Sequence, residues 1–135
     1  MKPFLDTNIL VYAQQSDRRS AKARSLIAAG GIISVQILDE LTNVLSRKLL
    51  RSWTEVAEVL EDIGDTVGPA LPLTIETHSA ALALARDHGF SFYDALVVAS
   101  AIDAGCDTLL SEDFQHGRVV GGLKICNPFE PEPTA

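Results

Sequence analysis

The sequence contains few cysteines and few aromatic residues, and it has no long hydrophobic run. Its two cysteines, Cys106 and Cys126, stand far apart and match no spacing of metal ligands, so we expect two reduced thiols near the core rather than a disulfide framework or a zinc site. No apolar run approaches the length that spans a bilayer, and the N-terminal residues lack the pattern of a signal peptide. Since 135 residues suit one domain with one core, these absences favour a soluble, cytoplasmic globular protein without a membrane partner.

Charge is distributed unevenly along the chain. The net charge of −7 argues against a protein that coats nucleic acid non-specifically. Between positions 18 and 51, however, seven basic residues are offset by only two acidic ones. Arg18, Arg19 and Lys22 in this segment are candidates for RNA binding. The same residues also suit ordinary solvent-exposed helix faces, and that is the favoured interpretation.

Short apolar segments alternate with amphipathic ones, which predicts strands alternating with helices. Phe4 and Leu5 are predicted as a buried strand, followed by a short helix that Thr7 or Asn8 caps. Further strands are predicted over 32–33, 70–74, 108–110 and 123–126, and further helices over 18–29, 34–49, 52–67, 80–88 and 91–102. This order predicts an α/β domain over residues 1–129 with a mostly parallel sheet covered on both sides, and a flexible tail over 130–135.

Two acidic residues follow predicted strands. Asp6 comes directly after the first strand and beside a helix start, and Asp113 lies just beyond the strand 108–110. Ligand sites in open α/β sheets gather at the carboxyl ends of strands, which makes both residues candidates for a site. Each also has an ordinary explanation as a cap or turn residue. Their neighbour Glu112 is expected in solvent, because successive side chains of an extended segment point in opposite directions.

Two further acids are placed by helices. Glu40 lies at the edge of the apolar arc of the helix 34–49, whereas Asp39 projects into water. Asp94 is the third helical residue after Ser91, where it would close a capping box and favour the helix dipole. The helix that Asp94 begins is almost entirely apolar, so it should be the most deeply packed one and start near the strand ends. Taken singly, each acid suits a structural role.

The four acids become informative as a set. Asp6, Glu40, Asp94 and Asp113 in one pocket would raise each other's pKa values, and a divalent cation would stabilise them. Oxygen ligands without clustered His or Cys favour Mg²⁺ or Mn²⁺ over zinc. A hard cation with open water positions is suited to phosphodiester hydrolysis. The hypothesis therefore requires that these four side chains meet.

The motifs that carry these acids resemble those of the PIN-domain family, and more narrowly the VapC toxins of bacterial and archaeal toxin–antitoxin pairs. The similar segments are Phe4–Asn8, the helix with Glu40, Phe92–Ala95, and Leu110–Asp113, and the similarity extends to about Phe129. A single piece such as Asp-Thr-Asn is weak evidence, but all four in this order are quite specific.

The resemblance implies a three-layer α/β/α fold and a Mg²⁺- or Mn²⁺-dependent endoribonuclease that cleaves structured RNA. By position, Asp6, Glu40, Asp94 and Asp113 match the family's catalytic and metal-binding acids, and Thr7, Asn8 and Ser111 match its supporting polar residues. The resemblance also implies a homodimer and a cognate antitoxin protein. Gln115 stands where some members carry another acid, which leaves open whether a second metal ion binds.

Two other functions fit parts of the sequence. A non-catalytic interaction module could keep the same fold and metal site. A phosphatase of the haloacid-dehalogenase type also begins with a strand that ends in a catalytic Asp, but it needs a second Asp where this chain has Asn8. The phosphatase is the weaker alternative.

Overall fold

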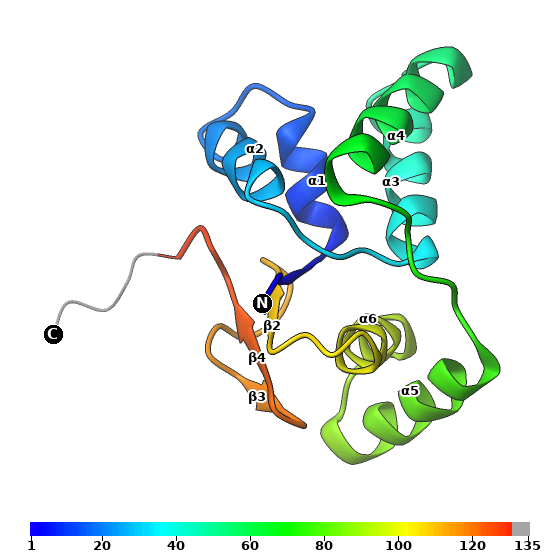
Figure 1. The fold of residues 1–135 in the computed structure, drawn as a ribbon, viewed down its shortest axis with the longest axis vertical. Coiled ribbons are helices and arrows are strands. Elements are labelled where there is room, and N and C mark those ends of the chain that lie inside the picture. Colours follow the sequence, from blue (N-terminus) through cyan, green and yellow to red (C-terminus); the bar gives the residue numbers. More distant parts are fainter. Residues whose placement is uncertain (131–135) are drawn as a thin grey trace, which may run out of the picture.

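The computed structural model describes residues 1–130 and contains a four-stranded sheet at its centre (Figure 1). The strands are β1 (Phe4–Leu5), β2 (Thr108–Leu110), β3 (Val119–Val120) and β4 (Leu123–Cys126), in the order β1-β2-β4-β3. β1 pairs with β2 and β2 with β4 in parallel, whereas β3 and β4 are antiparallel. The prediction of a mostly parallel sheet is confirmed. The predicted tail lies outside the described residues except for Glu130.

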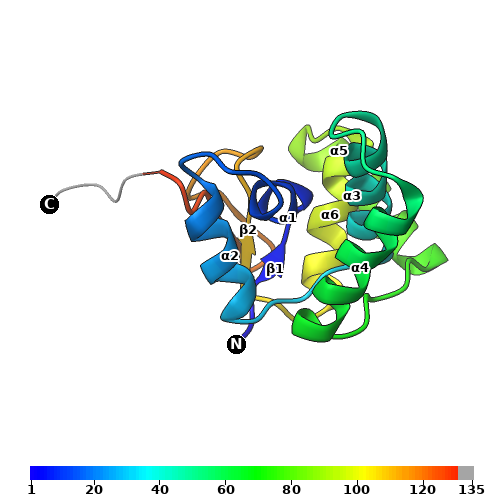
Figure 2. The ribbon, with the colours of Figure 1, turned by 90° about the horizontal axis from the view of Figure 1, so that it is seen from above.

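Six helices occupy most of the chain between β1 and β2. They are α1 (Thr7–Ala13), α2 (Ser20–Ala28), α3 (Val35–Arg47), α4 (Trp53–Val67), α5 (Ile75–His88) and α6 (Phe92–Asp103). Figure 2 shows α2 on one side of the strands and α6 on the other, so helices flank the sheet on both sides. None of the helices within residues 1–130 combines the length and the hydrophobicity that a membrane crossing requires.

The apolar helix α6 is packed as deeply as its sequence predicts. Seven consecutive residues from Ala95 to Ala101 are buried, and α6 contacts both β2 and β4. Because the buried residues of α6 begin at Ala95, the adjacent Asp94 in the first turn is held in a defined place. Both cysteines are free thiols, with Cys106 buried and Cys126 partly buried.

The predicted strands over 32–33 and 70–74 are wrong as continuous strands. Each is reduced to one isolated bridge, Ile32 with Phe4 and Ser34 with Leu71. The helix α3 starts directly after Ser34, and Pro69 and Pro72 have no backbone N–H to donate, so neither segment can pair along its length.

The hairpin of β3 and β4 is absent from the sequence-based prediction. Its strands are joined by Gly121 and Gly122, which both have positive φ angles of 55° and 81°. Two consecutive glycines permit the tight turn that antiparallel strands require. The Gly-Gly pair between apolar residues was the signal that could have identified this hairpin.

Candidate functional site

Asp6 lies where β1 ends and α1 begins, and its carboxylate is almost completely buried. It is the N-cap of α1, a role the sequence suggested for Thr7 or Asn8, and its Oδ1 accepts a hydrogen bond from Thr7 N–H at 2.8 Å. Leu5 pairs with Leu110 in the neighbouring parallel strand, so the residues after the two strands are adjacent. Ser111 Oγ consequently donates to Asp6 Oδ2 at 2.6 Å.

Burial makes the charge of Asp6 unfavourable. Desolvation is the largest influence, and it raises the pKa of Asp6 from 3.8 to about 6. The hydrogen bonds from Ser111 and Thr7 lower the pKa, while the nearby charges of Asp113 and Asp94 raise it. A carboxylate in this position is stabilised by taking up a proton or by a neighbouring cation.

Glu40 reaches the same site from α3. Thr7 Oγ1 donates a hydrogen bond to Glu40 Oε1 at 3.1 Å, so Thr7 at the start of α1 contacts both acids. Glu40 remains exposed at the rim of the site, yet its pKa is raised. The largest cause is desolvation of its carboxylate, and the second is the charge of Asp6. Thr7 opposes this rise, and the charges of Asp94 and Asp113 add to it.

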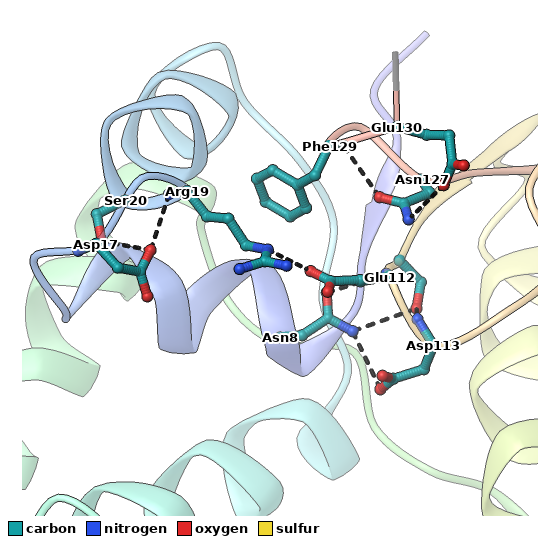
Figure 3. Close-up of polar contacts among 10 residues, drawn as sticks. Asn8, Asp17, Arg19, Ser20, Glu112, Asp113, Asn127, Phe129 and Glu130 are labelled. Carbon is teal, nitrogen blue, oxygen red and sulfur yellow. Dashed lines mark hydrogen bonds and ion pairs between the residues drawn. The ribbon is translucent and has the colours of Figure 1, made fainter. Parts of the chain in front are cut away.

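Asn8 fixes the segment that carries Asp113 (Figure 3). Its Nδ2 donates to Asp113 Oδ2 at 3.1 Å and to Ser111 Oγ at 3.3 Å, and its Oδ1 accepts from Glu112 N–H at 3.3 Å. Ser111 Oγ also accepts from Asp113 N–H at 3.0 Å. One amide side chain therefore orients the carboxylate of Asp113 toward α1.

Asp94 completes the group from the first turn of α6. Its N–H donates to Ser91 Oγ at 3.3 Å, but within residues 1–130 the reciprocal bond of a capping box is not formed. The predicted capping box is therefore only half present. The charge of Asp94 instead acts on both Asp6 and Glu40. The structure thus brings the four predicted acids near one another rather than placing any of them on the far side of the molecule.

An open cleft of about 550 Å³ lies beside these acids. Most of its walls come from α1 and α3, including Glu40. Asp113, from the segment after β2, also lines it. In the part of the chain from 1 to 130, no three acidic, histidine or cysteine side chains form a ready-made metal cluster. The donors nevertheless fit a hard cation in their chemistry, because all are oxygens and because a cation would relieve the raised pKa values of Asp6 and Glu40.

The basic residues of the segment 18–51 have different environments. Arg24 donates to the carbonyls of Ala13 and Gln15, and Arg51 donates to that of Gln14, so both secure the C-terminal end of α1. Arg18 and Lys22 are exposed. Arg19 forms an ion pair with Glu112, with 3.0 Å between Nε and Oε2, and the expectation that Glu112 lies in solvent is therefore wrong.

Lys48 is a cleft residue that the sequence analysis missed. It lines the cleft together with Glu40 and Val44 of α3. The three positions are spaced by four residues, which places them on one face of the helix end. The spacing of Lys48 from Glu40 is the sequence signal that could have identified Lys48 as a cleft residue.

Comparison with known proteins supports the architecture. The family model of the PIN domain matches residues 4–121. No curated protein gives a significant sequence match. A toxin–antitoxin complex from Klebsiella pneumoniae is similar in structure, with a TM-score of 0.74, 18% identity, and coverage of 96% of this chain and 100% of the other.

Two further solved structures are similar. The Mycobacterium tuberculosis toxin VapC20, described as cleaving the sarcin–ricin loop, has a TM-score of 0.67 and 21% identity over 83% of this chain and 92% of its own. VapBC2 from Rickettsia felis, bound to a DNA fragment from its promoter, has a TM-score of 0.67 and 20% identity over 93% of this chain and 97% of the other. At these identities the similarity shows a shared fold.

Proposed function

The chain belongs to the PIN-domain family, and from that premise we propose that it is a Mg²⁺- or Mn²⁺-dependent endoribonuclease, the VapC-type toxin of a toxin–antitoxin pair. The observation that carries this proposal is the group of four acids around Asp6, which come from two strand ends and two helices and whose charges act on Asp6 and Glu40. Carboxylates kept together in this way suit a cation-dependent site for phosphate chemistry.

We assign Asp6, Glu40, Asp94 and Asp113 as the residues that hold the metal ion. When bound, the ion would polarise a phosphoryl oxygen and stabilise the negative charge that develops during phosphodiester hydrolysis. Glu40 has a second task in this proposal, because a carboxylate whose pKa is raised is a stronger base toward the attacking water. Its Oε1 is engaged by Thr7, so Oε2 is the atom assigned to that proton.

The supporting residues orient these acids in the proposed mechanism. Thr7 fixes Glu40, Ser111 fixes Asp6, and Asn8 fixes Asp113, each through the hydrogen bonds already described. Such contacts hold acids in one geometry against their mutual repulsion, as groups hydrogen-bonded to metal ligands do in metal sites.

The proposed substrate is structured RNA, which would enter the open cleft between α1 and α3. Lys48 is the basic residue lining this cleft in the described part of the chain, and in this proposal it contacts a phosphate next to the one that is cleaved. Arg18 and Lys22 remain candidates for binding RNA outside the cleft.

The proposed partners follow from the similar structures, of which two contain toxin–antitoxin pairs by their description. We propose a cognate antitoxin, a homodimeric toxin and a cytoplasmic location for this protein. A short reading frame for a DNA-binding protein next to this gene would support the pairing, and its absence would count against it.

The enzymatic proposal is tested with purified protein, free of any partner, and a structured RNA. Cleavage should require Mn²⁺ or Mg²⁺, stop when a chelator is added, and be lost in D94N. If the wild type binds metal but cuts no RNA, the protein is the non-catalytic interaction module. If chelator leaves cleavage unchanged, the metal-dependent mechanism is wrong.

A further inference from the structure

The ion pair between Arg19 and Glu112 joins two parts of the chain that are far apart in sequence. Arg19 precedes α2, and Glu112 lies between Ser111 and Asp113 in the segment after β2. The side chains of Arg19 and Glu112 are only 25% and 23% exposed. Water screens such a pair less than it screens a fully exposed one, so the contact can hold geometry as well as carry charge.

The backbone of Arg19 is itself anchored, as Figure 3 shows. Its N–H donates to Asp17 Oδ1 at 2.8 Å, and Asp17 N–H donates to Ser20 Oγ at 3.0 Å. These bonds take the place of a side-chain cap at the start of α2, which has none. The guanidinium therefore projects from a fixed point toward Glu112.

Aromatic rings surround the same contact. The guanidinium carbon of Arg19 lies 5.1 Å from the centre of the Tyr12 ring, a cation–π distance, and Phe129 meets Tyr12 edge to face with 5.4 Å between ring centres. Tyr12, which packs against Phe129, restricts the positions that Arg19 can adopt. A side chain held by a ring, an acid and a fixed backbone is poorly suited to reach out to RNA.

The geometry points to Arg19 as a positioning residue: through its ion pair with Glu112 it holds the 111–113 segment so that Asp113 faces the cleft. Glu112 is linked to the acids through Asn8, whose Oδ1 accepts from Glu112 N–H and whose Nδ2 donates to Asp113. Loss of the pair frees a segment that carries one of four proposed ligands. This inference rests on the proposed nuclease function, and it replaces RNA binding as the role of Arg19.

The two roles of Arg19 predict different kinetics. A positioning residue affects the chemical step, so R19A should lower kcat roughly tenfold while KM and its salt dependence match those of the control R47A. An RNA-contacting residue would instead raise KM and reduce the salt dependence of binding. Arg47 is a matched control because it carries the same charge, is exposed at the end of α3 and lies outside both the cleft lining and the ion pair with Glu112.

The charge swap R19E/E112R provides the second arm. It restores an ion pair of opposite polarity, so kcat should recover most of what R19A and E112Q each lose, with all variants first shown to be folded by urea unfolding. Amide hydrogen exchange at residues 112 and 113 should be faster in R19A and slower again in the swap, a readout that requires no activity.

Several outcomes would overturn the inference. It is wrong if R19A behaves as R47A does in kcat and in amide exchange, if R19A changes KM alone, or if the swap is as impaired as the single variants. Failure of the proposed function is distinguishable, because a wild type without RNA cleavage would contradict the nuclease while the exchange experiment would still test the positioning role.

Discussion

Replacing Asp6 with Asn tests whether this buried carboxylate is held at a cost to stability. The pKa of Asp6 rises from 3.8 to about 6 on folding, mainly because the side chain is desolvated. Since the folded state then binds the proton more tightly than the unfolded state, ionisation of Asp6 destabilises the fold. The penalty is absent below pH 3.8, grows as the pH rises, and is complete above about pH 6.

The size of the penalty follows from the same two pKa values. A change from 3.8 to about 6 corresponds to about 3 kcal/mol of unfolding free energy, of which about 2 kcal/mol appears between about pH 4.5 and about pH 7.5. Asp6 is only 6% exposed, so solvent screening takes little from this figure. D6N carries no charge and therefore escapes the penalty. Any loss from altered bonds to Ser111 and Thr7 is largely independent of pH.

The assay is urea unfolding of wild type and D6N in chelator at about pH 4.5 and about pH 7.5. The stability of D6N relative to wild type should increase by about 2 kcal/mol at the higher pH. The control is D39N, which removes an exposed carboxylate of α3. The predicted effect is the amount by which the pH-dependent gain in unfolding free energy of D6N exceeds that of D39N. A difference between D6N and wild type that is flat with pH, or that falls as pH rises, would refute the reasoning.

Three further predictions concern the neighbours of the acids. T7V removes the donor to Glu40, so the pKa of Glu40 should rise further and cleavage should fall more on the acidic side of the pH profile than on the alkaline side; parallel pH profiles for the two proteins would contradict this. N8A should lower the unfolding free energy by about 1–2 kcal/mol in urea titrations, and an unchanged midpoint would show that its bonds contribute nothing. K48A should raise KM and reduce the salt slope by roughly 0.7, whereas R47A, next to it but outside the cleft lining, should not; equal effects would remove Lys48 from the RNA path.

The placement of the acids was predictable where local rules determine it. Neighbouring parallel strands end at the same edge of a sheet. Once β1 and β2 are located in the sequence, Asp6 is therefore expected near the residues that follow β2. Helical periodicity placed Glu40 at the boundary of α3, and the cap signal of Ser91 placed Asp94 at the start of α6. The apolar character of α6 also indicated its burial. These inferences use spacing of a few residues along the chain.

The remainder depends on contacts between distant segments, which no local rule supplies. The alternation of side chains along an extended segment predicted that Glu112 lies in solvent. Instead, Glu112 pairs with Arg19, which is 93 positions earlier in the chain. Basic residues counted as one patch are divided by the fold, because Arg24 and Arg51 are used to bind carbonyls of α1. The strand expected over 70–74 failed because pairing requires a partner of equal length as well as apolar residues.

The central claim is that four carboxylates form one cation site, and Mn²⁺ titration by calorimetry tests it most directly. The wild type should bind Mn²⁺, and each of D6N, E40Q, D94N and D113N should lose at least about tenfold in affinity, because every one removes an assigned ligand. D39N should bind as the wild type does. Wild-type affinity in any one of the four variants would remove that residue from the site, and wild-type affinity in all four would contradict the account.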